Sequence, residues 1–277
     1  MRSARLFVVN RLTVVLCFWY TYCLAIDAAV VLFFAGVLGG ALNAVAGGGS
    51  FVAFPALLFT GVPPIPSNAT NTIALWVGTT ASGGAYRGRY NLSRRVMVPL
   101  VATSVVGGLA GAFLLLRTPA HTFMQVLPWL MLGATLLFAF GKKLTGRSPS
   151  GLAHDASTTA LVGASVFELV VAVYGGYFGG GVGIMNLAML SALGMTDIHA
   201  MNALKVLLGG VINGVAVIPF AVKGAIYWPQ AIVMIIGATL GGYFAAHYAQ
   251  KLPQSWIRRF VLLVGTGMTV YFFVKAY

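Results

Sequence analysis

The chain has 277 residues, of which 59% are hydrophobic and only 8% are charged. A water-soluble surface needs about 25% charged residues, so this composition excludes a soluble protein and predicts one that contacts the lipid bilayer. The formal net charge is +13, but the basic residues stand in short segments between apolar ones, as topology signals do. This arrangement argues against a nucleic-acid partner.

Two cysteines and four histidines are present, and they lack the spacing of a metal site or a disulfide framework. No nucleophile–base pair stands in the apolar segments. The sequence therefore predicts no metal, no cofactor and no enzyme activity.

The predicted fold is an all-α polytopic membrane protein with about eight transmembrane helices in two repeats of four. Residues 1–23 are expected to form a basic N-terminal leader and the start of the first helix, resembling a signal peptide without a convincing cleavage site. The first transmembrane repeat covers 24–140, a polar linker 141–157, and the second repeat 158–277. A helix needs about 20 apolar residues to cross the hydrocarbon core. The expected crossings lie at 24–46, 68–86, 94–116, 122–140, 158–178, 199–222, 229–250 and 256–274.

A shorter apolar piece lies between the first two crossings of each repeat, at 51–60 and at 182–193. At 1.5 Å per residue, neither piece is long enough to cross the bilayer. We therefore expect re-entrant or half helices that begin at Ser50 and at Val182. Each follows a break of three glycines: Gly47, Gly48 and Gly49 in the first repeat, and Gly179, Gly180 and Gly181 in the second.

The second repeat keeps the order of features in the first. After each glycine break comes an asparagine, Asn71 or Asn202, and a glycine follows seven residues later. Each copy then has a pair of glycines and, after it, a turn in which a basic residue stands two positions before a proline: Arg117 and Pro119 in the first copy, Lys251 and Pro253 in the second. Such agreement over roughly a hundred residues predicts a duplication.

The basic residues also predict an orientation. With four crossings per repeat, the N-terminus, the loop around Arg87–Arg95 and the linker fall on one side, which their Lys/Arg content marks as cytoplasmic. Lys251, Arg258 and Arg259 then fall on the other side, against that rule. A parallel and an inverted arrangement of the repeats therefore both remain open.

The glycine breaks are the first candidate for a functional site. Non-helical backbone at membrane depth is tolerated only where protein buries it or a wet cavity adjoins it, and helix N-termini there offer free N–H groups and partial positive charge. We expect the two breaks to face each other and to form an anion site near the bilayer midplane. The alternative is close helix packing, which we expect for Gly39-Gly40, Gly107-Gly108 and Gly241-Gly242.

Lys205 is the clearest ionisable group inside an apolar helix. At 100° per residue, Asn202, Lys205, Gly209 and Asn213 share one narrow face, which must look into the protein or a water path. A buried ammonium must be paired, neutralised or poised for an anion. Two interpretations follow: a structural ion pair of Lys205 with Glu168, or Lys205 as counter-charge to an anionic substrate with Glu168 as a proton-coupling group.

The matching face of the first repeat, with Asn71 and Gly78, carries no charge. Asparagines near the breaks suit an oxyanion because an amide both donates and accepts, although interhelical hydrogen bonds explain them equally well. The predicted substrate-binding residues are Asn43, Gly47, Gly48, Gly49, Ser50, Thr70, Asn71, Gly179, Gly180, Gly181, Asn186, Asn202, Lys205 and Asn213.

Three segments carry a family resemblance: Phe34–Gly40, Ala46–Leu58 and Ser67–Thr72, followed by a weaker second copy. With them, the chain resembles the sulfite exporter TauE/SafE family over roughly residues 25–275. The resemblance implies a carrier of the bacterial inner (plasma) membrane for sulfite, sulfonates or related small anions, often an exporter, and it does not identify the substrate.

Together these features predict a secondary transporter that moves a small sulfur-containing anion, with export as the expected direction. Alternating access would occur at a midplane site between the repeats, with protons as candidate coupling ions. An anion channel would share the positive site but lack coupling. A structural membrane subunit would leave the glycine breaks and Lys205 without a role. A homodimer is left open.

Overall fold

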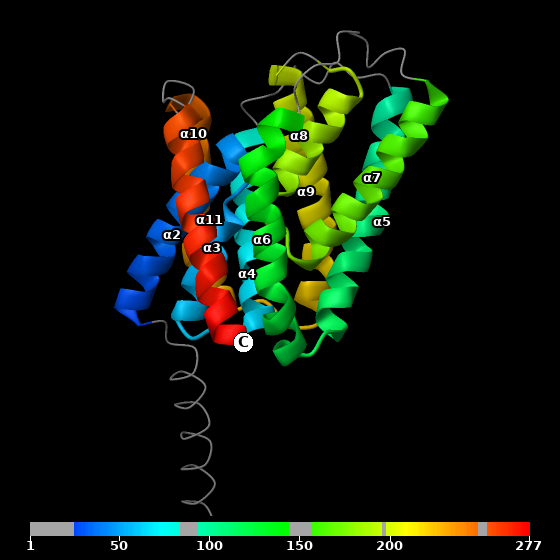
Figure 1. Cartoon of the computed structure of the whole chain (residues 1–277). Coiled ribbons are helices and arrows are strands. Elements are labelled where there is room, and N and C mark those ends of the chain that lie inside the picture. Colours follow the sequence, from blue (N-terminus) through cyan, green and yellow to red (C-terminus); the bar gives the residue numbers. More distant parts are fainter. Residues whose placement is uncertain (1–24, 84–93, 145–156, 196–197, 249–253) are drawn as a thin grey trace, which may run out of the picture.

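The computed structural model describes residues 25–83, 94–144, 157–195, 198–248 and 254–277. These residues form ten helices and no strand (Figure 1), so the predicted all-α fold is confirmed. The leader and most of the linker lie outside the described residues. In chain order the helices are α2 (Ile26–Ala46), α3 (Ser50–Phe59), α4 (Pro64–Gly83), α5 (Arg94–Arg117), α6 (Ala120–Leu144), α7 (Thr158–Tyr177), α8 (Val182–Ala192), α9 (Ile198–Val222), α10 (Trp228–Tyr248) and α11 (Gln254–Ala276).

Seven of the described helices, α2, α5, α6, α7, α9, α10 and α11, are long and apolar enough to cross a membrane. The remaining long helix, α4, has 20 residues, about 30 Å at 1.5 Å per residue, but it is more polar than the others. Protein buries its polar side chains, since Asn68 and Asn71 are 0% and 1% exposed. The number of eight crossings stays a prediction.

The two short helices begin where the glycine breaks predicted. α3 begins at Ser50 and has 10 residues, and α8 begins at Val182 and has 11. Gly47 ends α2 with φ 73°, and Gly181 precedes α8 with φ 82°. Residues with a Cβ avoid this left-handed region, so glycine is what allows the chain to turn between the paired helices.

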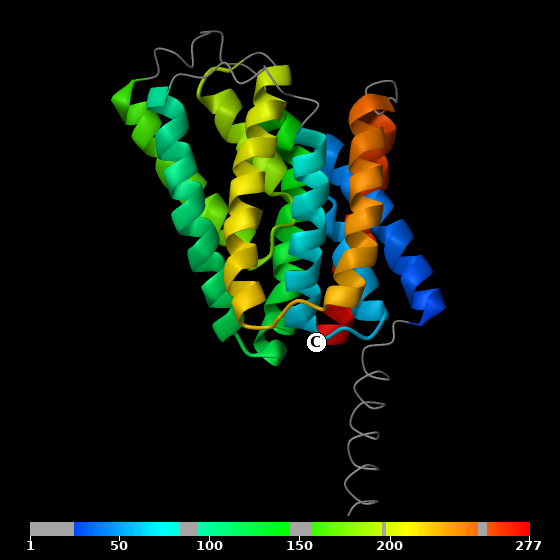
Figure 2. The same ribbon diagram turned by 180° about the vertical axis from the view of Figure 1, so that it is seen from behind.

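The two halves run through the bundle in opposite directions. In Figure 1, α2 enters from the end that holds the C-terminus, α3 returns to that end, and α4 then crosses the bundle. α7 enters from the other end, α8 returns there, and α9 crosses in the direction opposite to α4, as the reverse view in Figure 2 also shows. The arrangement of corresponding helices is therefore inverted.

This geometry corrects the predicted orientation. The ends of α4, α6 and α10 and the starts of α5, α7 and α11 all lie at one end of the bundle (Figure 1), which we call the basic end. α2 begins at the opposite end, because α2 and α3 form a hairpin that enters and leaves from one side. The expectation that Arg258 and Arg259 lie at the end opposite Arg94 and Arg95 was therefore wrong. The expected side of the N-terminal leader concerns residues outside the described part of the chain. The described helix turns at the basic end contain Arg94, Arg95, Lys142, Lys143, Arg258 and Arg259.

Each half packs against helices of the other half. α5 packs on α7 and α9, whereas α10 packs on α2 and α4. Glycines make these crossings close: a Cβ at Gly107 would lie 2.6 Å from the Ala172 Cβ, and a Cβ at Gly241 would overlap the Val37 backbone. The expected packing role of the three glycine pairs is confirmed.

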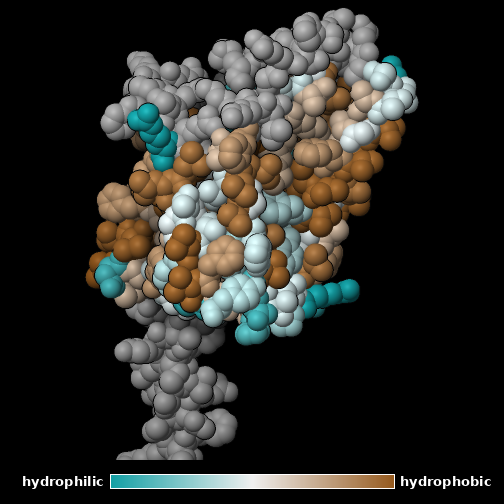
Figure 3. Space-filling view, in the orientation of Figure 1, coloured by the Kyte–Doolittle hydropathy of each residue, from teal (hydrophilic) through white to brown (hydrophobic). Residues whose placement is uncertain are grey.

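On the face shown in Figure 3, apolar residues cover both flanks of the bundle, residues of intermediate hydropathy lie between them, and the most hydrophilic residues lie towards its ends. Large apolar side chains such as Phe34, Val170 and Ile236 are more than half exposed. A soluble monomer rarely presents so wide an apolar surface. The chain is therefore a multi-pass membrane protein whose sides face lipid.

Candidate functional site

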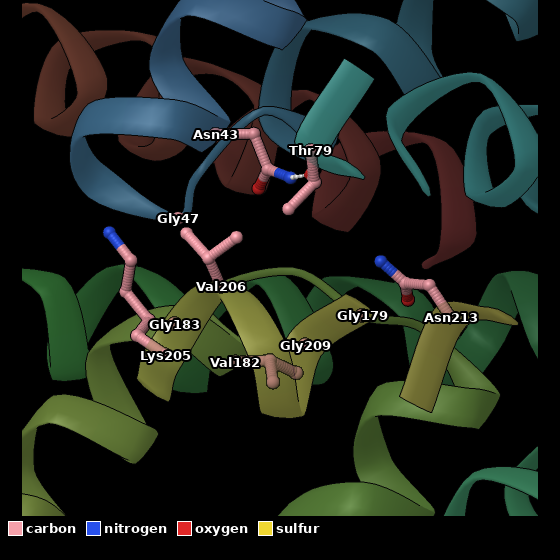
Figure 4. A pocket seen from close by; sticks show the side chains of 10 residues that line it. All are labelled: Asn43, Gly47, Thr79, Gly179, Val182, Gly183, Lys205, Val206, Gly209 and Asn213. Atoms are coloured by element: carbon pink, nitrogen blue, oxygen red, sulfur yellow. Dashed lines mark hydrogen bonds between the residues drawn. The ribbon is translucent and has the colours of Figure 1, made fainter. Parts of the chain in front are cut away.

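A polar cavity lies where the two halves meet, between α2 and α4 of the first half and α8 and α9 of the second (Figure 4). Its volume is about 30 Å³, measured as the space open to the centres of water-sized spheres, or about two or three water positions. The lining residues are Asn43, Gly47, Thr79, Gly179, Val182, Gly183, Lys205, Val206, Gly209 and Asn213.

The two glycine breaks meet at this cavity. A Cβ at Gly47 would lie 2.9 Å from the Gly183 Cα, and a Cβ at Gly183 would lie 3.0 Å from the Gly47 Cα. The backbones therefore touch without room for a side chain on either residue. The first two residues of α8, Val182 and Gly183, line the cavity, and no described side chain caps this end of the helix, where the first N–H groups have no partner within the helix.

Lys205 extends from α9 along the second break towards the end of α2. Its side chain is 3% exposed, and its Nζ donates to the Ala44 carbonyl at 3.4 Å. Ala44 stands in the last turn of α2, where carbonyls have no partner within the helix and the helix dipole is negative. Within the described residues, the Lys205 ammonium is thus held by a helix end and not by a carboxylate.

Glu168 lies elsewhere, in the interface between α5 and α7. It is 0% exposed, the Ser104 hydroxyl donates to its Oε1 at 2.6 Å, and its Oε2 has no partner among the described residues. The interpretation of a Lys205–Glu168 ion pair is therefore wrong. α7 directs Glu168 towards α5, whereas Lys205 reaches across to α2.

Amide and hydroxyl groups complete the cavity wall. The Asn43 Nδ2 donates to the Thr79 Oγ1 at 2.6 Å, and the Thr79 hydroxyl donates to the Leu75 carbonyl at 2.7 Å. This chain of bonds ties α2 to α4 beside the cavity. Asn213 adds a second amide from α9, one face of which also carries Lys205 and Gly209 (Figure 4).

The structure brings together five of the fourteen predicted site residues: Asn43, Gly47, Gly179, Lys205 and Asn213. The other nine, which do not line the cavity, are Gly48, Gly49, Ser50, Thr70, Asn71, Gly180, Gly181, Asn186 and Asn202.

Several of these nine residues have structural partners instead. Ser50 accepts a bond from Asn71 at 3.1 Å, and Thr70 accepts one from the Tyr227 N–H at 3.0 Å. The Gly180 carbonyl accepts a bond from Tyr174 at 2.7 Å. No residue of the half helix α3 lines the cavity, whereas α8 contributes Val182 and Gly183 from its N-terminus.

Five lining residues were absent from the predicted set: Thr79, Val182, Gly183, Val206 and Gly209. Gly209 shares the polar stripe of α9, and Val182 and Gly183 directly follow the second break, so both signals were visible in the sequence. Thr79 was not foreseeable, because the expected polar face of α4 was that of Asn71 and Gly78. A Cβ at Gly78 would lie 2.8 Å from the Ala238 carbonyl, so that face packs on α10.

The chemistry of the cavity is that of hydrogen-bond donation. One ammonium, two amides and a helix N-terminus surround the space, and no carboxylate lines it. In the described part of the chain no three His, Cys, Asp or Glu side chains group together as metal ligands would. Such a wall suits the oxygens of an anion.

Interrupted helices in two inverted halves, meeting at a polar cavity inside an apolar bundle, define a membrane transporter. The chain belongs to the sulfite exporter TauE/SafE family, whose sequence pattern matches residues 32–272. The fold and the family thus agree on a transporter and not an enzyme.

Three curated relatives carry similar names. A probable membrane transporter protein, ORF9, of Sinorhizobium sp. is 24% identical over 212 residues, covering 76% of this chain and 78% of the relative. A probable membrane transporter protein of Haemophilus influenzae is 28% identical over 215 residues, covering 76% and 80%. The probable membrane transporter protein YfcA of Escherichia coli K12 is 28% identical over 210 residues, covering 73% and 74%. No solved structure matches this chain.

Proposed function

We propose that this transporter is a secondary carrier of a small sulfur-containing oxyanion, such as sulfite or a short sulfonate, in the bacterial inner membrane. The anion binds in the cavity, where Lys205 supplies the charge. Asn43, Asn213 and the N-terminus of α8 supply further donors. Export is the direction that the family description favours.

The main support for this proposal is that Lys205 is buried without a counter-charge among the described residues. Lys205 is only 3% exposed, yet its ammonium has only a long bond to a neutral carbonyl among the described residues. A buried charge without a counter-charge is costly, and a bound anion at the cavity would provide one. The Ala44 carbonyl holds the ammonium in place until the anion arrives.

The size of the cavity supports a small substrate. Space for about two or three water positions admits an anion of a few heavy atoms and would have to widen for a larger sulfonate. Lys205, Asn43 and Asn213 come from α9 and α2, so the anion would be held between the two halves. Inverted halves that rock about such a site would expose it to each side in turn.

Protons are the proposed coupling ions, with Glu168 as their carrier. Glu168 stands eleven residues before Gly179, and Gly36 stands eleven residues before Gly47. A Cβ at Gly36 would lie 2.6 Å from the Met234 carbonyl oxygen of α10, so the first half has a tight helix contact where the second has a carboxyl group. An acidic residue that interrupts a packing interface inside the membrane marks a functional position.

Transport into proteoliposomes tests the proposal. Radiolabelled sulfite, a short alkyl sulfonate and chloride are offered with and without a pH gradient. We expect saturable sulfite flux that responds to the pH gradient, and a smaller response to chloride. Absence of saturable flux for both sulfur anions would refute the substrate class, and electrical currents too large for a carrier would favour a channel.

The matched pair for this assay is Lys205→Met and Lys223→Met. Lys223 is exposed and directly follows the last residue of α9, the helix that carries Lys205, but it lies away from the cavity. Loss of flux in Lys205→Met alone would assign the effect to the cavity charge and not to the net charge of the helix.

A further inference from the structure

Asn186 is a fully buried amide with unusual surroundings. It lies on α8 with 0% of its surface exposed, and neither its Nδ2 nor its Oδ1 has a partner among the described residues. Most buried amides in folded proteins are hydrogen-bonded, and an unpaired one lowers stability. Its polar atoms therefore call for an explanation that packing alone does not give.

The position of Asn186 relates it to the cavity. α8 leaves the cavity at Val182 and Gly183 and runs to the basic end (Figure 1). Asn186 follows Gly183 by three residues, about 4.5 Å further along that path. Asn186 thus lies just beyond the cavity, between it and the basic end.

α9 provides a second amide at the same depth. α8 and α9 are antiparallel neighbours, and a Cβ at Gly183 would lie 3.1 Å from the Lys205 Cδ. Asn202 precedes Lys205 by three residues, so it is displaced from Lys205 by about 4.5 Å in the same direction. The two asparagines continue the polar lining of the cavity towards the basic end.

An apolar cluster closes this path in the structure. It joins residues near the basic ends of α5, α7, α8 and α9, and we call it the basic-end cluster. Its buried members are Val96, Leu100, Leu161, Ala164, Met189, Leu190, Leu193, Met201, Leu204 and Leu208.

We propose that Asn186 is a second contact for the anion, used when α8 and α9 separate at the basic-end cluster. The anion would leave Lys205 and accept a hydrogen bond from the Asn186 amide before it reaches the basic end. This inference rests on the proposed function, because it takes the cavity as the first anion site.

Cysteine reactivity tests the contact without any substrate. Asn186→Cys and Leu32→Cys are compared in a background in which Cys17 and Cys23 are Ser; Leu32 is also 0% exposed but lies on α2 beside α10, in the core of the first half. Anionic and cationic membrane-impermeant methanethiosulfonates are added from each side. We expect the anionic reagent to modify the Asn186→Cys variant from the basic end at least about tenfold faster than the Leu32→Cys variant, and faster than the cationic reagent does.

Sulfite flux into proteoliposomes provides an independent test of the role of Asn186. Asn186→Leu removes the amide and should lower sulfite flux about tenfold. Met185→Leu, on the same helix but packed against a different apolar cluster, should leave flux near the wild-type value.

Equal reactivity of the two cysteine variants would overturn the second contact, whatever the flux of Asn186→Leu. Absence of sulfite flux in the wild type would instead refute the proposed substrate, and the reactivity comparison would still decide the role of Asn186.

Discussion

The contact between the two glycine breaks can be measured through a pair of alanine substitutions. Gly47 has φ 73° and touches Gly183, whereas Gly61 has φ 86° and would have no atom within 4 Å of an added Cβ. An L-residue in this left-handed region costs about 1–2 kcal/mol, and both variants bear that cost. Only Gly47→Ala adds a methyl group 2.9 Å from the Gly183 Cα.

The Gly47 backbone has little freedom to relieve this overlap. Its N–H donates to the carbonyls of Leu42 and Asn43, each at 3.1 Å. Overpacking of this kind costs about 1–3 kcal/mol. We therefore expect a loss of about 2–5 kcal/mol for Gly47→Ala and of about 1–2 kcal/mol for Gly61→Ala.

The assay is denaturant unfolding of the purified protein in mixed micelles, followed by tryptophan fluorescence. The difference between the two variants isolates the contact of the breaks from the backbone cost. Losses that agree within about 0.5 kcal/mol would show that the breaks do not touch and would refute the described cavity.

Three further predictions concern coupling, binding and orientation. Glu168→Gln keeps the shape of the side chain but not its titratable proton, so flux should lose its response to a pH gradient while anion exchange continues; a retained response would exclude Glu168 as the carrier. Asn43→Ala should raise the sulfite concentration for half-maximal flux about 10- to 150-fold, since hydrogen bonds to charged groups contribute about 1.5–3 kcal/mol, and Thr80→Ala, which loses a bond to the Val77 carbonyl, should not. In a cysteine-free background, Lys223→Cys should react with an impermeant maleimide in intact cells and Ser157→Cys only in inverted vesicles, because the basic end is expected to be cytoplasmic; the reverse pattern would contradict this orientation.

Local signals in the sequence predicted the interrupted helices well. Consecutive glycines allow backbone angles closed to other residues, so the breaks and the helix starts at Ser50 and Val182 could be assigned from the sequence. Helical periodicity likewise placed Lys205, Gly209 and Asn213 on one face of α9, and all three line the cavity.

Such local signals could not predict which helices pack against each other or which distant residues form bonds. Whether α2 and α7 cross the bilayer or form hairpins with α3 and α8 depends on their packing against α10 and α5, and that choice reversed the predicted side of Arg258 and Arg259. The bond from Lys205 to Ala44 could not be predicted either, because it joins residues 161 apart in the sequence. Residue types suggested Glu168 as the partner of Lys205, but the faces on which the helices meet decided otherwise.

The polar helix α4 shows a third limit. The sequence predicted a crossing at 68–86 and a substrate-binding role for Asn71, although α4 is not among the helices apolar enough to be identified as crossings. In the structure, Asn68 donates to the Tyr177 carbonyl at 3.0 Å and Asn71 to Ser50 at 3.1 Å. These amides connect α4 to α7 and α3, the helices beside the two breaks, which only the assembled bundle reveals.

Equilibrium binding of radiolabelled sulfite to the purified protein tests the central claim, that Lys205 holds the anion in the cavity. A hydrogen bond to a charged group contributes about 1.5–3 kcal/mol, so Lys205→Met should weaken binding about 10- to 150-fold while Lys223→Met leaves it unchanged. Sulfite binding of equal affinity in the wild type and in Lys205→Met would contradict the account.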